Sequence, residues 1–336
     1  MSLQTTMMNP NLPRFELEGN LERSTMVMNQ GSIRRTRVDP DQENEAVMIF
    51  KKPRVEDSKP ERPVMPYQEL SPNYEAAEEK ETSLKMVCGS FYLPKENELR
   101  PQGEDAHFIC AQENTIGVAD GVGGWANKGI DSGIYARELM INSVMAVHNQ
   151  QKTSSGIINP RKVLDEAFSN TKNIQGSSTA CVLTLNKDVL HSANVGDSGF
   201  MLFRNKKFLF KSSTQQHKFN CPFQLGNAVR SDRPSSAREM KVRVIPGDVI
   251  VLGTDGLLDN MFGREMEQVL EEKTEKEEGD VDPEMLAGVI AELALYNSFD
   301  RFRDSPFSVA AKKAGFRHEG GKVDDITVVV AAIMKS

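Results

Sequence analysis

The stretch TIGVADGVGGWANKG, residues 115–129, decides how the rest of the chain is interpreted. A short apolar run ends at Asp120, and four glycines and the only tryptophan of the chain follow within the next nine residues. Such a stretch fits a tight Asp-Gly turn between strands, a glycine loop that binds phosphate, or a strand end that presents a carboxylate to a metal ion. The remaining sequence must decide among these three.

Length and composition limit the class of protein. The chain has 336 residues, of which 38% are hydrophobic and 26% charged, so one large domain or two ordinary ones can form a core. The net charge of −7 argues against general nucleic-acid binding. No apolar run approaches the roughly 20 residues that span a bilayer. Four cysteines without a C-x-x-C pair, and no recognisable secretory leader, favour reduced structural thiols in an intracellular protein.

The chain divides near residue 82. Residues 1–82 are rich in Pro, Glu, Asn, Arg and Met and show no sustained hydrophobic period, which predicts a disordered, low-complexity tail. From residue 83 onward short β-branched and apolar runs appear, bounded by Gly, Asn, Asp or Lys. We therefore expect one globular domain over residues 83–336.

The runs of this domain predict strands with a few helices between them. Clear strand candidates are TIGVA, TACVLTL, VLHSANV, FMLF, KFLF, KVRVI, DVIVLGT and DITVVVAAI. The short polar segments 186–188 and 204–207 predict hairpin turns. Helices are expected after Asn159–Pro160, after Asp282–Pro283 and from Asp131 to His148. Consecutive strand pairs with helices between them are typical of an α+β layered domain.

Aspartates recur at the ends of the apolar runs. Asp120, Asp197 and Asp255 each follow such a run, and Asp324 precedes the last one. Carboxylates gathered at one edge of a sheet layer would repel one another and raise each other's pKa. A hard divalent cation removes this problem, and oxygen ligands favour Mg²⁺ or Mn²⁺ over Zn²⁺. The glycines that follow, Gly121 and Gly256, would let the backbone approach a metal-bound water.

The glycine-loop alternative is weaker. GVGGWA, residues 121–126, fits the dinucleotide fingerprint only in its relaxed form. Asp120 would stand beside the diphosphate and repel it, and no second parallel strand ending in an acidic residue follows promptly. The P-loop pattern G-x-x-x-x-G-K-[ST] is absent from the sequence. The aspartate positions together favour the metal interpretation.

Six motifs in order resemble those of the metal-dependent serine/threonine protein phosphatases of type 2C. They are GEDAHF (103–108), VADGVGGW (118–125), GSSTACVLTL (176–185), ANVGDSGF (193–200), GTDGLLDN (253–260) and DDITVVV (324–330). The resemblance covers residues 84–334. It is nearest to the branch typified by the mitochondrial phosphatase that targets coenzyme Q biosynthesis, and within that branch to its plant members.

The resemblance implies a fold and an activity. The fold would be a four-layer α/β/β/α sandwich, in which two antiparallel sheets are flanked by helices and hold a two-metal site at one end. The activity would be hydrolysis of phosphoserine and phosphothreonine in phosphoprotein substrates, by a water activated between two Mn²⁺ or Mg²⁺ ions. A monomer without nucleic acid or membrane span is expected, in a mitochondrion or plastid, with cytosol and nucleus left open. The rival is a pseudophosphatase that keeps the fold as an interaction module.

The resemblance also assigns residues. Asp120 would bridge both ions, the Gly121 carbonyl would bind the first, and Asp255 and Asp324 the second. Glu104 and Asp105 would hold the first ion through water, and Asp197 and Asp259 would hold a weaker third ion. Arg100, four residues before Glu104, has the spacing of the family's phosphate-binding arginine, and a guanidinium matches the paired oxygens of a phosphate.

Two departures from the family stand out. Val122 occupies the position at which the best-known members carry a histidine that protonates the leaving alkoxide. Water, His107 or His217 would then supply the proton, or turnover would be slower; for His107 the alternative is a packed, hydrogen-bonded histidine. The segment 212–236 also lacks the usual Ala-Gly-Gly-type signature of the substrate flap, which leaves substrate preference open.

Overall fold

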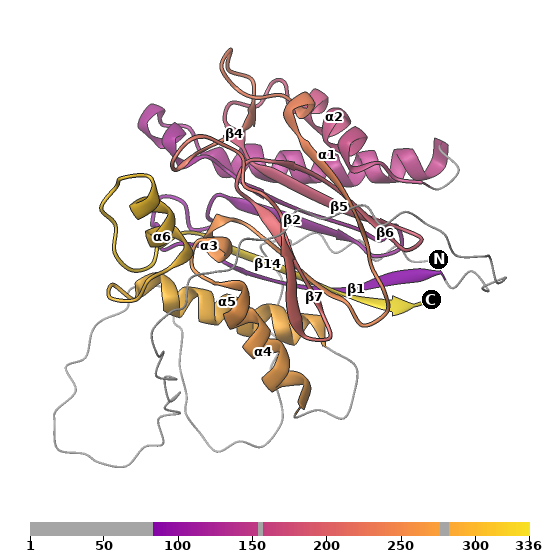
Figure 1. The fold of residues 1–336 in the computed structure, drawn as a ribbon. Coiled ribbons are helices and arrows are strands. Elements are labelled where there is room, and N and C mark those ends of the chain that lie inside the picture. Colours follow the sequence, from indigo (N-terminus) through magenta and orange to yellow (C-terminus); the bar gives the residue numbers. More distant parts are fainter. Residues whose placement is uncertain (1–82, 154–156, 276–281) are drawn as a thin grey trace, which may run out of the picture. The chain divides into compact units, whose positions relative to one another are not determined.

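The computed structural model describes residues 83–153, 157–275 and 282–336, all of which belong to one compact unit of the chain. The tail expected over residues 1–82 lies outside the described residues. Two packed antiparallel sheets form the centre of this unit, and helices cover their outer faces (Figure 1). The four-layer α/β/β/α sandwich expected from the sequence is therefore confirmed.

Each sheet has five strands. The first has the order β1 (Leu84–Leu93), β14 (Ile326–Lys335), β13 (Val249–Gly253), β7 (Gly199–Arg204) and β8 (Lys207–Lys211). The second has the order β12 (Arg238–Arg243), β6 (Val189–Val195), β5 (Ala180–Asn186), β3 (Thr115–Asp120) and β2 (Asp105–Cys110). Short strands lie outside them: β4 (Ser177–Ser178) pairs with β11 (Leu225–Gly226), and β9 (Gln216–Lys218) with β10 (Cys221–Pro222).

Helices cover the outer face of each sheet. Helices α1 (Ser132–Thr153) and α2 (Pro160–Asn170) lie on the second sheet, and α4 (Gly263–Glu275) and α5 (Pro283–Phe299) on the first. Shorter helices are η1 (Gly123–Lys128), η2 (Pro234–Ser236), α3 (Asp255–Leu258) and α6 (Pro306–Lys313). None of the helices within the described ranges is long and apolar enough to cross a membrane.

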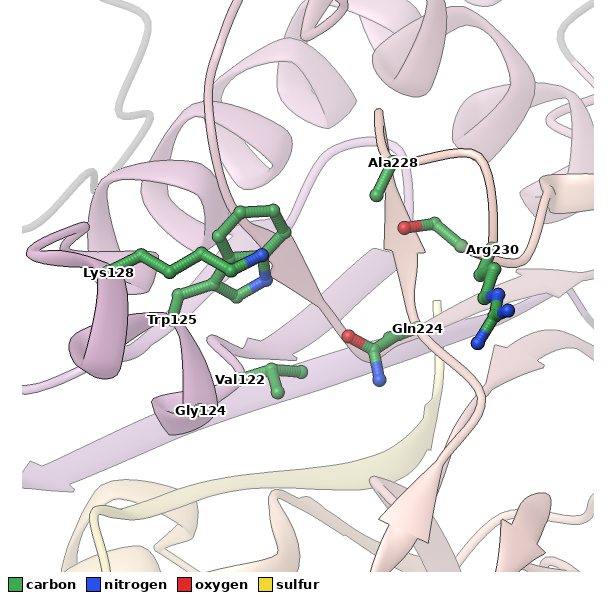
Figure 2. Close-up of a pocket in the computed structure, with 8 residues that line it drawn as sticks. Val122, Gly124, Trp125, Lys128, Gln224, Ala228 and Arg230 are labelled. Carbon is green, nitrogen blue, oxygen red and sulfur yellow. The ribbon is translucent and has the colours of Figure 1, made fainter.

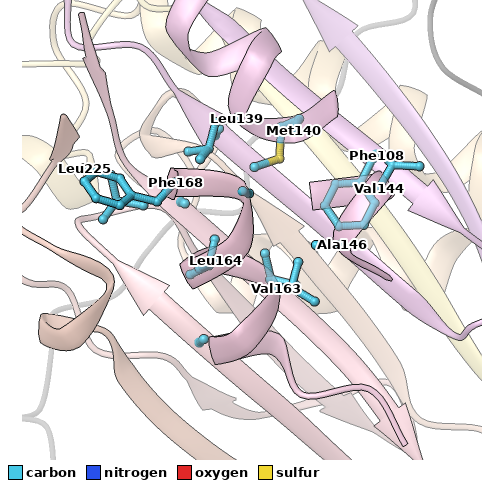
Figure 3. Packing of buried hydrophobic residues seen from close by; sticks show 14 of the residues in the cluster. Phe108, Leu139, Met140, Val144, Ala146, Val163, Leu164, Phe168 and Leu225 are labelled. Carbon is cyan, nitrogen blue, oxygen red and sulfur yellow. The ribbon is translucent and has the colours of Figure 1, made fainter. Parts of the chain in front are cut away.

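Three hydrophobic clusters hold these layers together. One joins α1 and α2 to the second sheet, and Figure 3 shows its members Leu139 and Met140 from α1 and Val163 and Leu164 from α2. A second joins α4 and α5 to the first sheet, and a third fills the space between the sheets. Each fully buried aliphatic side chain contributes about 1.5–3 kcal/mol, so these layers form a rigid frame for the residues at their edges.

Local signals in the sequence predicted several elements well. The Asn159 side chain accepts hydrogen bonds from the backbone N–H groups of Arg161 and Lys162, and Asp282 caps α5 in the same way. The turn between β7 and β8 places Asn205 and Lys206 at positive φ, as a two-residue hairpin of type I′ requires. The dinucleotide alternative is wrong, because the short helix η1 begins at Gly123 and, within the described residues, β3 pairs antiparallel with both of its neighbours, β2 and β5.

Other elements were not predicted. In strand β1 the apolar residues are interrupted by Lys85, Gly89 and Ser90, so the sequence does not show a continuous apolar run there. A Cβ at Gly89 would lie 2.3 Å from the backbone nitrogen of Glu284, so the glycine allows α5 to lie close to the strand. Helix α4 is mostly polar, and α6 begins at a Ser305 capping box in which Ser308 replaces the usual Glu or Gln. The predicted helix 131–148 begins at Ser132 and extends to Thr153.

The strand register brings the aspartates to one edge. Asp105 on β2 stands directly opposite Asp120 on β3. In the other sheet, the end of β13 stands opposite the beginning of β14, with Gly253 paired to Val328. The turn between β6 and β7 passes from the second sheet to the first and carries Asp197. Segments far apart in the sequence therefore deliver carboxylates to the same end of the sandwich.

Candidate metal centre

Three aspartates form the closest group of carboxylates at this end. Oxygens of Asp120, Asp197 and Asp255 all lie within 4.8 Å of one another. Asp120 ends β3, Asp197 lies in the turn before β7, and Asp255 begins α3, with Thr254 between it and the end of β13. The apolar strands fix these positions, because each strand is buried on both sides up to the residue before the turn. The sequence prediction of clustered carboxylates is therefore confirmed for this group.

The electrostatics of the group are unfavourable without a cation. Burial raises the pKa of Asp120 well above its usual value, and Asp255, Asp105, Asp324 and Asp197 raise it further. Burial likewise raises the pKa of Asp255, although the Lys322 ammonium opposes this shift. The pKa of Asp197 is raised to about 6, again chiefly by burial. Several negative charges thus share a space from which most water is excluded.

Lys322 supplies the one ammonium group that contacts this cluster among the described residues. Its Nζ donates to the carboxylate of Asp255, lies 3.1 Å from Asp259 Oδ2, and lies 3.1 Å from Asp324 Oδ2. Asp255 and these two aspartates therefore surround the ammonium, whereas Asp120 forms no ion pair with it among the described residues. Sequence reasoning missed Lys322. Its position two residues before Asp324, where the sandwich brings several carboxylates together, is a signal that becomes informative only with the fold.

Two buried carboxylate oxygens lack a hydrogen-bond partner among the described residues. Asp105 Oδ2 accepts hydrogen bonds from the hydroxyls of Thr254 and Thr327, each at 2.7 Å, but its Oδ1 is unpaired. Asp197 Oδ2 accepts from Gln216 at 3.0 Å, and its Oδ1 is unpaired. Unpaired buried acceptors cost about 1–3 kcal/mol each. A divalent cation with its waters would satisfy them, so the residues present fit such an ion.

Glu104 and Arg100 lie at the rim of the site. Glu104 Oε1 accepts hydrogen bonds from Arg100 Nη1 at 2.6 Å and from the Ser132 hydroxyl at 2.7 Å. The backbone N–H of Glu104 donates to Asp325 Oδ2 at 2.8 Å. Asp325 also accepts from the backbone of Lys95, so this residue ties the loop before β2 to the start of β14. The arginine expected to bind phosphate is thus held beside the acidic pair.

The two glycines after Asp120 and Asp255 have different roles. A Cβ at Gly121 would lie 2.6 Å from the carbonyl oxygen of Ser132 and 2.7 Å from that of Glu104. A Cβ at Gly256 would lie 1.9 Å from the carbonyl oxygen of Asp325. Gly256 therefore allows α3 to pack against the start of β14. The expectation that it opens the backbone to a metal-bound water is not needed to explain this glycine.

No described histidine contacts the carboxylate cluster. His107 Nε2 lies 3.0 Å from the Ser90 hydroxyl, and burial lowers its pKa to about 4. His217 Nε2 lies 2.9 Å from Asp232 Oδ2, and its ring stacks on Phe223. The role of a packed histidine, expected for His107, agrees with its contacts. Val122 directly follows Gly121 and lines a pocket with Trp125, so its place beside the cluster is held by an apolar side chain.

Two packed antiparallel sheets with an all-oxygen, carboxylate-rich centre at one end define a class of metal-dependent phosphatases. The family model described as Protein phosphatase 2C matches residues 90–223. "Protein phosphatase PTC7 homolog fig" of Drosophila mojavensis is 40% identical over 69% of this chain and 78% of its own length. The chain belongs to the protein phosphatase 2C family.

Plant relatives and solved structures agree. "Probable protein phosphatase 2C 55" of Arabidopsis thaliana is 49% identical over 75% of this chain, and "Probable protein phosphatase 2C 80" of the same plant is 47% identical. The chain spans only 53% and 60% of the length of these two relatives. The structure titled photosystem II phosphatase PBCP is 31% identical, with a TM-score of 0.66 over 74% of this chain and 98% of that one. The resemblance found in the sequence motifs is confirmed.

Proposed function

We propose that this protein hydrolyses phosphoserine and phosphothreonine esters in other proteins, with Mn²⁺ or Mg²⁺ held by the carboxylate cluster. The observation that carries the proposal is the approach of Asp120, Asp197 and Asp255 within 4.8 Å. Membership of the protein phosphatase 2C family supports the reaction class. A structure of the phosphatase PstP, 16% identical with a TM-score of 0.52, is titled as a complex with two manganese ions, and it shares the fold.

The ligand set that we propose carries the assignments implied by the family resemblance onto the residues at this edge of the sandwich. In this set Asp120 would hold both ions, the Gly121 carbonyl would hold the first, and Asp255 and Asp324 would hold the second. Glu104 and Asp105 would contact the first ion through water, and the unpaired Oδ1 of Asp105 supports this role. Asp197 and Asp259 remain proposed ligands of a weaker third ion. The unpaired Oδ1 of Asp197 supports the assignment of Asp197 to this ion.

The side chains of the chain itself bind and orient the substrate phosphate. Arg100 would donate paired N–H groups to two phosphate oxygens, and its ion pair with Glu104 holds the guanidinium at the rim. Asp105 is fixed by its two threonine hydroxyls and therefore keeps one oxygen directed at the site. When bound, the divalent cations would lower the pKa of a coordinated water and polarise the phosphoryl group.

Proton delivery to the leaving group differs from that in the best-known members of the family. Val122 cannot donate a proton, and His107 and His217 hydrogen-bond to other residues. In our proposal the leaving alkoxide takes its proton from solvent. Substrates with good leaving groups should therefore react faster than alkyl phosphates. The ratio of these two rates should be larger than in an enzyme that carries a histidine at this position.

No observation favours the pseudophosphatase alternative. Every side chain assigned to a metal ligand carries a carboxylate, and Gly121 is assigned through its backbone carbonyl. A fold kept only for interactions has no physical reason to retain charges whose mutual repulsion raises the pKa of Asp120 and Asp255.

The test is phosphate release from a phosphothreonine peptide by the intact chain. We expect release that requires Mn²⁺ or Mg²⁺, stops with EDTA and is lost in the double variant Asp120→Asn, Asp255→Asn. An Asp188→Asn variant, altered in the β5–β6 hairpin turn at the far end of the sheet, serves as the matched control. Activity that survives both EDTA and the double variant would contradict the two-metal mechanism.

Compartment and oligomeric state remain proposals. We propose an organelle, mitochondrion or plastid, in keeping with the plant relatives and with the structural neighbour titled as a photosystem II phosphatase. A fluorescent protein fused to the C-terminus of the intact chain tests this, and a diffuse cytosolic or nuclear signal would contradict it. We also propose a monomer, for which light scattering of the purified protein should give a mass near 37.4 kDa.

A further inference from the structure

A small pocket opens beside the metal centre. It has a volume of about 290 Å³ and is lined by Val122, Gly124, Trp125, Lys128, Gln224, Ala228, Arg230 and Ser231. Val122 directly follows Gly121, so the pocket begins one residue from a proposed metal ligand. A volume near the lower limit for ligand sites suits a single side chain better than a cofactor.

The charged residues of this pocket are both cationic. Figure 2 shows Lys128 along the Trp125 ring on one side and Arg230 on the opposite side, with Val122 and Gln224 between them. None of the eight described lining residues is acidic. Lys128 Nζ lies 4.6 Å from the centroid of the Trp125 ring, and no ion pair with a described carboxylate involves Lys128 or Arg230. Two cations without acidic partners are notable in a chain of net charge −7.

The walls of the pocket are held by hydrogen bonds. Trp125 Nε1 donates to the Ser177 hydroxyl at 2.6 Å, and that hydroxyl donates to Gln224 Oε1 at 2.6 Å. The backbone N–H of Val122 donates to the Ser177 carbonyl at 2.9 Å. Ser177 thus joins the wall formed by η1 to the wall formed by the segment after β10. The pocket is therefore formed in the free protein.

The loop that carries Arg230 is also anchored. Asn227 Nδ2 donates to the carbonyl oxygens of Thr171 at 2.9 Å and Ile174 at 2.8 Å. The backbone N–H of Ser231 closes a turn onto the carbonyl of Ala228. Arg230 lies within this turn and is exposed, so its guanidinium can reach an incoming anion without breaking an existing ion pair.

We infer that this pocket binds an anionic side chain, a carboxylate or a second phosphate, that flanks the phosphorylated residue of the substrate. The inference rests on the proposed function and adds a specificity subsite to it. A glutamate or phosphoserine places an apolar stem against Val122 and Trp125 and its anionic end between Lys128 and Arg230. One wall of the pocket, with Gln224 and Arg230, belongs to the segment 212–236 in which the sequence lacks the usual flap signature, so substrate preference has a physical origin there.

The experiment compares phosphothreonine peptides that differ at one flanking position at a time. Each position on either side carries alanine, leucine, lysine, glutamate or phosphoserine in turn, and kcat/KM for release from the threonine is measured with the intact chain and Mn²⁺. We expect an anionic residue at one position to raise kcat/KM about tenfold over alanine, the size expected for two partly exposed charge contacts. Raising the ionic strength should reduce this ratio.

The variants assign the preference to the pocket. The double variant Lys128→Met, Arg230→Gln should lower the ratio of anionic to neutral peptides to about one, and Arg230→Glu should favour the lysine peptide. Lys152→Met with Arg238→Gln, two exposed cations outside the pocket, should keep the ratio of the unaltered protein. If only the phosphoserine peptides are preferred, the pocket binds a phosphate. If glutamate peptides are preferred equally, the pocket also binds carboxylates.

The outcomes separate the two proposals. No phosphate release from any peptide would contradict the proposed function. Release at equal rates from all peptides, a preference for leucine, or an anion preference that survives the double variant would contradict the pocket inference and leave the phosphatase activity intact.

Discussion

Strand β13 is flanked by Asp248, directly before it, and by Asp255, two residues after it, and both side chains are buried. Asp248 accepts hydrogen bonds from Arg204 Nε at 2.9 Å and Nη2 at 2.8 Å, and from the backbone N–H of Ile245 at 3.0 Å. Asp255 shares a single ammonium with two other aspartates.

The difference shows what each end of the strand is for. At Asp248 the chain supplies a paired guanidinium, so the buried charge is satisfied by the fold itself. At Asp255 the neighbours include Asp120 and Asp197, and the pKa values of all three are raised. A buried carboxylate that is paired with a cationic side chain of the protein has a structural role. A cluster of buried carboxylates with too few cationic side chains can bind a metal ion.

The largest effect should come from Asp120→Asn. Loss of the shared ligand should lower kcat/KM about 10³-fold, because metal ligation supplies several kcal/mol of transition-state stabilisation. The melting temperature without metal should not fall, because the change removes a carboxylate that four other aspartates disfavour. Steady-state kinetics with scanning calorimetry in EDTA measures both. Retained activity, or a melting temperature lowered by several degrees, would contradict the assignment.

The matched change at the other end, Asp248→Asn, should do the reverse. It breaks the buried pair with Arg204, which costs about 3 kcal/mol, or about 10 °C in melting temperature for a domain of this size. The activity of the folded protein should persist, since Asp248 lies at the far end of β13. Thermal unfolding and kinetics well below the transition test this. Loss of activity without loss of stability would contradict the structural role assigned to Asp248.

A third prediction concerns the packing of α3. Gly256→Ala should destabilise the protein by about 2 kcal/mol, because the new Cβ would lie 1.9 Å from the carbonyl of Asp325. Gly288→Ala in α5 is the control, since a Cβ there meets only Phe91, at 3.6 Å, and alanine favours helix. Urea unfolding of both variants measures the difference. Equal stabilities would show that α3 adjusts freely.

Lys322→Met should change metal binding in the opposite direction from a ligand variant. The ammonium lies where it contacts Asp255, Asp259 and Asp324, so its removal should tighten Mn²⁺ binding about tenfold, or about 1.4 kcal/mol. The metal-free protein should become less stable. Lys95→Met, whose Nζ lies 3.6 Å from Asp324 and is more exposed, should change the affinity less. Weaker Mn²⁺ binding by Lys322→Met would show that the lysine organises the ligands instead of competing for them.

The smallest effect should come from His107→Gln. Burial lowers the pKa of His107 to about 4, so the imidazole is neutral above that pH and its replacement removes no charge near neutrality. We expect kcat within about twofold of the unaltered protein and the same pH dependence between about pH 5.5 and 8. A shift of the acidic side of the kcat–pH profile in the variant, relative to the unaltered protein, would identify His107 as the proton donor.

Much of the fold could be predicted from local signals in the sequence. The runs before Asp120 and Asp255 are strands because short apolar runs with several β-branched residues bury both faces of a sheet. The Asn159 and Asp282 caps locate two helices because their side chains bond the first free N–H groups. Strand β1 was missed because its pairing with β14, and the approach of α5 at Gly89, are tertiary facts.

The candidate site was predictable only in part. The aspartates could be found because each stands at the end of an apolar run. Lys322 could not, since nothing local distinguishes it among 41 lysines and arginines until the fold surrounds it with three carboxylates. The pocket between Trp125 and Arg230 was missed for the same reason, because its two walls are 105 residues apart in sequence and meet through Ser177.

Calorimetric titration of the metal-free protein with Mn²⁺ tests the central claim most directly. The account predicts two ions bound per chain in the unaltered protein and in Asp248→Asn, and loss of both high-affinity sites in Asp120→Asn. Equal Mn²⁺ binding by all three proteins, or no binding by any, would contradict the assignment of the carboxylate cluster as a divalent metal centre.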